Sequence, residues 1–325
     1  MNWLNISLTI NEFAWGWVNT LKTRSIKVWA MLFILLVCLI TMILFGYISF
    51  QSLKQNLELQ YKQEADSVLN QTATSFDSSF QTVENFLEQL EQTIQLQLQQ
   101  NLDSEEFKTL FNTYQSVIPS NGSLIYGYVN DRIYIGNDME VPNDFKPFNR
   151  EWYKYALLNK GDINWTVPYL DYFNQTLVIS ASKYINSANN NGVIGIDLQL
   201  NELSKIISNS SIGENGLVML LNQDGTVIAN RNSYLIGESI FGNEYRKIIE
   251  QSRMDYIPLE IDGKSYIIRS SNFKRNGMNI ITAISEDELN NLLMQNLIPI
   301  LVTGVICILI FSVIGYGLTL IWMRP

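Results

Sequence analysis

The stretches VWAMLFILLVCLITMILFGYISF (Val28–Phe50) and LIPILVTGVICILIFSVIGYGLTLIWM (Leu297–Met323) decide the layout of this 325-residue chain. Neither contains Asp, Glu, Lys or Arg. A hydrocarbon core of ~30 Å needs about 20 helical residues, so each stretch is long enough to cross a membrane. A helix in a soluble core would carry a polar stripe. The pattern therefore predicts transmembrane helices over residues 28–50 and 297–323, with one polar block between them.

The charges around these stretches predict their orientation. Short flanking segments rich in Lys and Arg stay in the cytoplasm. Residues 1–27 and 324–325 are therefore expected in the cytoplasm, and residues 51–296 outside the plasma membrane. That outer block carries 30 acidic and 18 basic residues, which argues against nucleic acid or anionic lipid as a partner. The flanking basic residues are Lys22, Arg24, Lys27 and Arg324.

Cysteine usage fits a bacterial envelope protein. Cys38 and Cys307 both lie in the apolar stretches, so no disulfide can link the outer block. At about 245 residues, that block is large enough to bury its own core. A secreted eukaryotic domain would more often carry disulfides.

The outer block begins with a helical stalk region, residues 51–118. Residues 51–100 lack Gly and Pro and carry apolar side chains at alternating steps of three and four, which predicts one long amphipathic helix. Asp103, with Glu106 three residues later, forms a capping box for a second helix that ends near Val117. The apolar stripe contains Ala73, Phe76, Phe80, Val83, Leu87, Leu90 and Ile94.

Beyond Gly122 the pattern changes to short β segments separated by turns. We expect two α+β modules, residues 119–212 and 213–285, each an antiparallel sheet with helices beside it. A helix over 286–296 then leads into the second apolar stretch. The predicted strands are 124–129, 132–135, 165–169, 176–185, 192–198, 218–222, 226–229, 256–261, 266–271 and 278–284, with a polar loop at Asn186–Asn191.

One group of polar and aromatic residues in the first module can bind a ligand. It comprises Arg150-Glu151-Trp152-Tyr153, Tyr169-Leu170-Asp171, and Asp197 near the end of a strand. In order and spacing these residues resemble the motif of double Cache sensor domains in bacterial transmembrane receptors, in the amino-acid-binding branch. The resemblance covers most of residues 51–296. It implies two PAS-like modules, of which the first is membrane-distal and binds the ligand.

The chemistry of these residues suits a free amino acid. The Arg150 guanidinium offers a planar fork of donors to a carboxylate, and the indole N–H of Trp152 and the hydroxyl of Tyr153 add neutral donors. Asp171 and Asp197 can accept hydrogen bonds from an ammonium group. The resemblance implies the same roles.

Two further aromatic residues complete the expected site. Tyr169 can hydrogen-bond an ammonium group or present its ring face to it. Phe145 stands where the branch often has a Tyr that helps to hold the ligand. Phe keeps the ring but lacks the hydroxyl, which leaves room for an altered ligand such as a methylated amine.

A purely structural interpretation of the same residues stays open. Trp152 and Tyr153 can anchor a short helix to the sheet. Arg150 can pair with Asp197 as an internal ion pair, and Asp171 can cap a turn.

The leading functional hypothesis is the sensing and transmembrane part of a methyl-accepting chemotaxis protein, working as a homodimer. Met323-Arg324-Pro325 resembles the start of a HAMP relay, so we expect an output part and cytoplasmic signalling partners beyond these residues. The same sensor on a histidine kinase, a diguanylate cyclase or a phosphatase is an alternative. A structural stalk without a ligand is another.

An envelope enzyme is the weakest hypothesis. The chain has no His, which excludes Ser-His-Asp and Cys-His catalytic sites and every His-ligated zinc site. A hydrolase with Asp171 and Asp197 as paired carboxylates is formally possible, but an Arg among aromatic residues suits a zwitterion better. We therefore expect no catalytic residue, no cofactor and no metal site.

Overall fold

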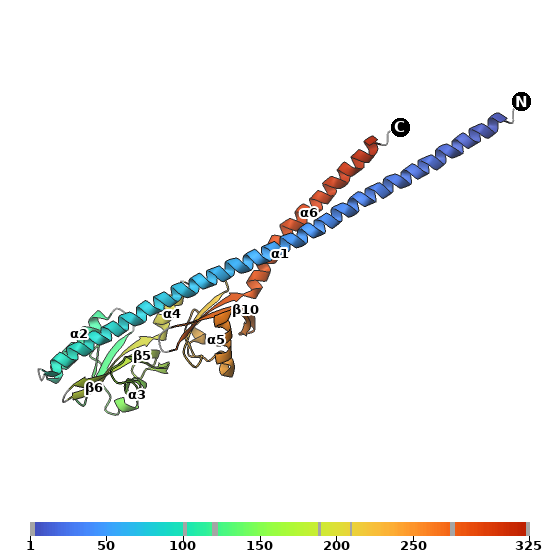
Figure 1. Cartoon of the computed structure of the whole chain (residues 1–325). Coiled ribbons are helices and arrows are strands. Elements are labelled where there is room, and N and C mark those ends of the chain that lie inside the picture. The colour runs from blue at the N-terminus through green and yellow to red at the C-terminus, as the bar shows by residue number, and fades with distance from the viewer. Residues whose placement is uncertain are drawn as a thin grey trace. The chain divides into compact units, whose positions relative to one another are not determined.

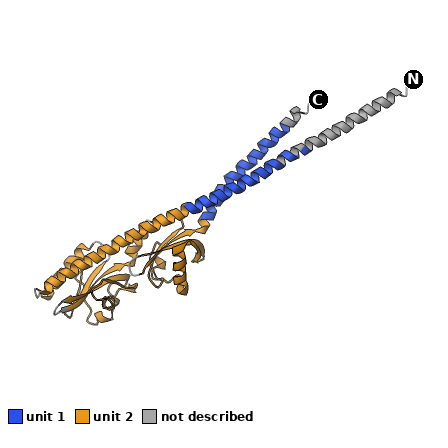
Figure 2. Cartoon of the chain, viewed as in Figure 1, with its two compact units in different colours: residues 1–59, 289–325 blue, residues 60–288 orange. Residues whose placement is uncertain are grey.

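The computed structural model describes the backbone of residues 4–99, 103–118, 123–187, 190–208, 210–273 and 277–322. The chain forms two compact units (Figure 2). One contains Met1–Leu59 with Leu289–Pro325, and the other contains Gln60–Glu288. Helices α1 (Leu4–Gln99) and α6 (Glu286–Trp322) contribute to both units (Figure 1).

Each of these two helices contains a stretch that is long and apolar enough to cross a membrane. Leu32–Gln99 of α1 and Glu286–Gly317 of α6 each contain a strongly apolar stretch, and neither stretch is buried. The two helices contact each other within their unit, because a Cβ added to Gly304 would lie 2.3 Å from the Met42 methyl carbon. Both apolar stretches predicted from the sequence are therefore helical candidates for membrane spans.

The first sheet is antiparallel, with strand order β2-β1-β6-β5-β3 and β4 paired to β5. Its first hairpin turns at Asn130-Asp131, where both residues have positive φ, 53° and 58°. This backbone matches the right-handed twist of the paired strands, so the predicted turn is confirmed. The strands are β1 (Leu124–Val129), β2 (Arg132–Ile135), β3 (Asn164–Trp165), β4 (Tyr169–Leu170), β5 (Leu177–Ser187) and β6 (Asn190–Gln199).

Helices α1 and α2 (Ser104–Val117) cover one face of this sheet (Figure 1). The predicted capping box of α2 is confirmed, with Asp103 accepting from the Glu106 amide at 3.0 Å and Glu106 accepting from the Asp103 amide at 2.9 Å. Lys183 of β5 forms an ion pair of 2.5 Å with Glu91 of α1. The opposite face carries η1 (Pro147–Asn149) and α3 (Glu151–Ala156), while α4 (Leu200–Ser208) follows β6 directly.

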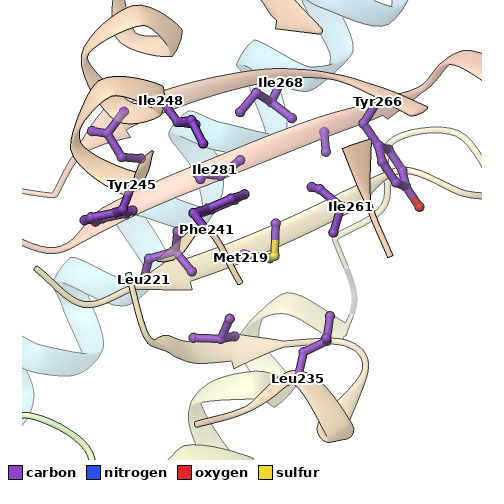
Figure 3. Packing of buried hydrophobic residues seen from close by; sticks show 13 residues of the cluster. Met219, Leu221, Leu235, Phe241, Tyr245, Ile248, Ile261, Tyr266, Ile268 and Ile281 are labelled. Carbon is purple, nitrogen blue, oxygen red and sulfur yellow. The ribbon is translucent and has the colours of Figure 1, made fainter. Parts of the chain in front are cut away.

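The second sheet is also antiparallel, with order β8-β7-β11-β10-β9. Ile248 and Tyr245 of α5 (Tyr245–Met254) pack over Ile268 and Ile281 in an apolar cluster (Figure 3). The other elements of this module are β7 (Leu217–Leu221), β8 (Val227–Asn230), β9 (Ile257–Ile261), β10 (Lys264–Asn272), β11 (Asn279–Ser285), η2 (Ser233–Leu235) and η3 (Gly242–Glu244). The α+β class with two antiparallel sheets and a long first helix is thus confirmed.

Two local predictions in the first module were wrong. The expected polar loop Asn186–Asn191 is mostly strand, since Asn186 pairs with Asn191 and Ser187 with Asn190. Its Asn-rich composition suggested a loop, but the long β5–β6 ladder overrides that local preference. The expected strand 165–169 is split into β3 and β4, because Pro168 between them has no amide N–H to donate.

Candidate ligand-binding site

A small, partly open space lies on the face of the first sheet that α1 and α2 do not cover. Its volume is about 10 Å³, which is close to the minimum for one water molecule. The structure brings six of the seven predicted site residues to its walls. The lining residues are Phe145, Arg150, Trp152, Tyr169, Asp171 and Asp197, together with Tyr126, Ile133, Tyr172 and Phe173.

Strand alternation in β1 and β6 positions Asp197. Tyr126 pairs with Gly195 across the β1–β6 ladder, and Asp197 lies on the same sheet face, two residues further along β6. A Cβ on Gly195 would lie 2.6 Å from the Tyr126 ring. Gly195 therefore leaves the space through which the Tyr126 hydroxyl reaches the Asp197 carboxylate.

Three hydroxyls surround one oxygen of the Asp197 carboxylate. Oδ1 accepts from Tyr126, from Ser180 at 2.5 Å and from Tyr169 at 3.1 Å. Asp197 is only 2% exposed, and this burial raises its pKa to about 7, although hydrogen bonds from Ser180 and Tyr126 favour the charged form. A cation placed in the cavity would favour the carboxylate and reverse that shift.

Asp171 lines the cavity and also shapes the loop between β4 and β5. Its Oδ2 accepts from the Asn174 amide at 2.7 Å, and its own amide donates to the Thr176 carbonyl at 2.8 Å. The loop contains Gln175 with a φ of 51°. Asp171 thus makes the turn contact expected from the structural interpretation while it faces the same space as Asp197.

Arg150 lies between two aromatic rings. Its Cζ is 4.9 Å from the centre of the Phe145 ring and 4.2 Å from that of the Tyr172 ring. Its Nε is buried and has no hydrogen-bond partner among the described residues. The ion pair with Asp197 that the structural interpretation allows does not form in the part of the chain that the structure describes. An unpartnered buried N–H is unfavourable. A ligand atom that accepts a hydrogen bond from this guanidinium would remove that cost.

Three rings from two loops lie together beside Arg150. Phe145 is 5.2 Å from Tyr172 and 5.1 Å from Phe173, and these last two are 5.3 Å apart, centre to centre. We call Phe145, Tyr172 and Phe173 the aromatic lid. Sequence reasoning named only Phe145, although Tyr172 and Phe173 directly follow the predicted Asp171.

Trp152 and Tyr153 take different positions. The buried Trp152 ring lies 4.7 Å from Tyr126 and helps to wall the cavity. Tyr153 is not among the lining residues. Its ring contacts Phe148 at 5.1 Å and Tyr128 at 6.0 Å, as the anchoring alternative expects.

Two polar residues of the site, Tyr126 and Ser180, were missed from the sequence. Strand pairing brings both hydroxyls to Asp197, because Ser180 is the partner of Asp197 in the β5–β6 ladder and Tyr126 is the partner of Gly195 in the β1–β6 ladder. The alternation of β1 and β5 could have indicated which face they occupy, but the register could not be derived from local sequence.

Comparison with known proteins identifies a family and several relatives that share this sequence pattern. A family model described as a Cache domain matches residues 50–293. Methyl-accepting chemotaxis protein McpA of Bacillus subtilis is 22% identical over 239 residues, which cover 74% of this chain and 36% of McpA. TlpB of the same organism is 25% identical over 189 residues, covering 57% of this chain and 28% of TlpB. The chain thus spans about a third of the length of these relatives.

Solved structures share the fold. The sensory domain of Campylobacter jejuni chemoreceptor Tlp3 with isoleucine bound has a TM-score of 0.58 at 21% identity, covering 73% of this chain and 97% of that one. The ligand-binding domain of Pseudomonas aeruginosa PctB in complex with L-Arg has a TM-score of 0.54 at 19% identity, covering 72% and 97%. Because the family model covers most of the chain, including both sheets, the protein belongs to the Cache domain family.

Proposed function

We propose that this chain is the ligand-sensing and transmembrane part of a bacterial chemoreceptor, and that it binds a small amino-acid-like zwitterion or amine in the first module. Membership of the Cache domain family supports a sensor role. The similarity to methyl-accepting chemotaxis proteins supports a chemotactic one.

The observation that carries this proposal is a guanidinium and a carboxyl group that line one cavity without pairing with each other. Arg150 keeps a buried N–H without an acceptor, and Asp197 keeps a buried carboxyl group whose bonded partners are hydroxyls. A zwitterion would bring a carboxylate to the first group and an ammonium to the second. It would therefore satisfy both groups at once.

The size of the cavity connects binding to a conformational change. Ligand pockets normally measure about 300–1,000 Å³, whereas this space measures about 10 Å³. An amino acid fits only if some of the lining residues move outward, and we assign this movement to the aromatic lid. The ligand then prefers one of two conformations, which is the condition for a signal.

The membrane layout follows from the charges. With Lys22, Arg24 and Lys27 before one span and Arg324 after the other, both ends lie in the cytoplasm and residues 51–296 outside the cell. The first module is then membrane-distal. The receptor works as a homodimer, and the part of the protein beyond this chain contacts the cytoplasmic signalling proteins.

A thermal-shift screen of the detergent-solubilised chain against amino acids and methylated amines tests the proposal. A bound compound at a hundredfold excess over its Kd adds about 2.7 kcal/mol of stability. Arg150→Ala and Asp197→Ala should each remove the shift. Lys154→Ala, which removes an exposed cation of α3 paired with Glu151, should keep it. No shift with any compound, or a shift that both site variants retain, would contradict the proposal.

A further inference from the structure

The segment that joins the two modules is held by acidic side chains from α1 and α6. Within residues 210–216, the Glu214 amide donates to Glu288 Oε1 at 2.9 Å, and the Asn215 amide donates to Glu288 Oε2 at 2.8 Å. The Gly213 amide donates to Glu64 of α1 at 3.2 Å. Glu288 thus binds two consecutive linker amides with its two oxygens. We call these contacts of Glu288 the linker clamp.

Tyr61 and Gly213 both lie close to the Glu288 carboxylate. Tyr61 of α1 donates to Glu288 Oε1 at 2.9 Å. Gly213 has a φ of +58°, and a Cβ there would lie 2.2 Å from Glu288 Oε1 and 2.8 Å from the Tyr61 ring. Only glycine combines this backbone conformation with so close an approach.

The hydrogen bonds also determine the charge of the clamp. Burial would raise the pKa of Glu288, but the amides of Glu214 and Asn215 and the Tyr61 hydroxyl outweigh it and leave that pKa below its usual value. Glu288 is therefore ionised at neutral pH. It lies in the first turn of α6, where a negative charge is favourable.

The linker clamp provides a short connection from the cavity to α6. Asp197 lies near the end of β6, and α4 begins directly after this strand at Leu200. The linker follows α4, and Glu288 connects it to the helix that carries the second apolar stretch. This route does not pass through the second sheet, which also reaches α6 through β11.

We propose that Glu288 is the positioning residue that couples the first module to α6, so that a displacement of β6 and α4 moves α6 through the linker. The proposal rests on the sensor function proposed above. Coupling between two sites is reciprocal. Release of the clamp should therefore disturb α4 even when no ligand is present, which gives a test that does not depend on ligand identity.

Hydrogen exchange of the full chain in lipid nanodiscs provides that test. Glu288→Gln keeps the shape but replaces one accepting oxygen by an NH₂ group. It should raise exchange roughly tenfold at the Glu214 and Asn215 amides, because bonds to a charged acceptor are lost, and severalfold in residues 200–208. Glu286→Gln is the matched control, because Glu286 lies in the same helical turn without a contact to the linker in the described chain. A change confined to residues 210–216 would overturn the proposal.

A second measurement uses the native cysteines as reporters. Cys38 of α1 and Cys307 of α6 are free and line one cavity in their unit, so spin labels on both report the α1–α6 separation. We expect an equimolar mixture of the twenty standard amino acids to change the label spectrum of the wild-type chain. Glu288→Gln should keep the thermal shift but lose this change, and a full spectral response in that variant would contradict the coupling.

The two proposals can fail separately. No thermal shift of the wild-type chain with the mixture counts against amino-acid binding, while the exchange comparison still decides the coupling. Should Glu288→Gln fail to fold, Tyr61→Phe removes one hydrogen bond to Glu288 and keeps both linker amides. A smaller rise in exchange in residues 200–208 is then expected. The absence of any rise would overturn the proposal.

Discussion

In the first module, the sheet face beneath α3 buries Asp197 and Ser180, whereas in the second, the face beneath α5 buries Ile268 and Ile281. Both sheets are antiparallel and both carry a helix on this face. One leaves a small cavity lined by Arg150 and Asp197, and the other fills the corresponding region mainly with apolar side chains (Figure 3). The same architecture therefore supports a candidate site in one place and a packed core in the other, because function depends on residues rather than on the fold.

The largest expected effect comes from moving a carboxylate into the second core. Ile281 is fully buried, so Ile281→Asp should lower the free energy of unfolding by at least about 4 kcal/mol, because the hydroxyl of its strand partner Ser270 already donates to the Ile249 carbonyl. Asp197→Asn keeps its hydroxyl partners and should change that free energy by no more than about 1 kcal/mol. Chemical denaturation of both variants measures the difference. Equal losses of unfolding free energy in the two variants would show that the two modules do not differ in how well they accommodate a buried polar group.

The second-largest effect concerns one arginine from each module, Arg150 and Arg253. Arg150→Ala should weaken binding of a zwitterion about a hundredfold, because a charge-assisted contact to its carboxylate is lost. Arg253 of the second module also makes a short contact, to Asn279 at 2.6 Å, but Arg253→Ala should leave affinity unchanged. Titration calorimetry compares the two, and an equal weakening would mean that both modules contribute to binding.

A smaller effect should appear in the pH dependence of the first module. The pKa of Asp197 is raised to about 7 in the empty protein, and an ammonium ligand binds the ionised form. Its affinity should therefore fall about tenfold per pH unit below that value and level off above it. The same titration makes the empty protein less stable as pH rises from about 4 to 7. Calorimetry between about pH 5 and 8 measures the slope, which Asp197→Asn should abolish.

The smallest predicted effect compares two buried tyrosines. Tyr126 donates to Asp197, and Tyr245 of the second module donates to the Asn222 carbonyl at 2.7 Å. Each Phe variant should lower the free energy of unfolding by about 1 kcal/mol. Only Tyr126→Phe should shift the pH profile of binding upward, by roughly one unit, because a donor to the carboxylate is lost. An unshifted profile would contradict the role given to Asp197.

Features that depend on nearby residues could be predicted from the sequence. The capping box of Asp103 and Glu106 needs only four residues, and the Asn130-Asp131 turn needs only two. Six of the seven residues of the α1 stripe are buried, as predicted, but Ala73 is only half-buried and Thr72 beside it is buried instead. Local chemistry and periodicity are sufficient for such elements.

The parts of the site that depend on register and loop packing could not be predicted. Ser180 reaches Asp197 because of one particular β5–β6 register. The stacking of Tyr172 on Arg150 depends on two loops that are distant in sequence. The motif residues themselves fix neither feature, and for this reason they could not indicate how little space lies between the charges.

The most direct test of the central claim compares three related compounds: an amino acid identified by screening, its amide without the carboxylate, and its deaminated acid. If Arg150 and Asp197 bind opposite ends of a zwitterion, Arg150→Ala weakens the amino acid but leaves affinity for the amide unchanged. Asp197→Ala then weakens the amino acid but leaves affinity for the deaminated acid unchanged. Equal losses for all three compounds in both variants, measured by titration calorimetry, would contradict this account.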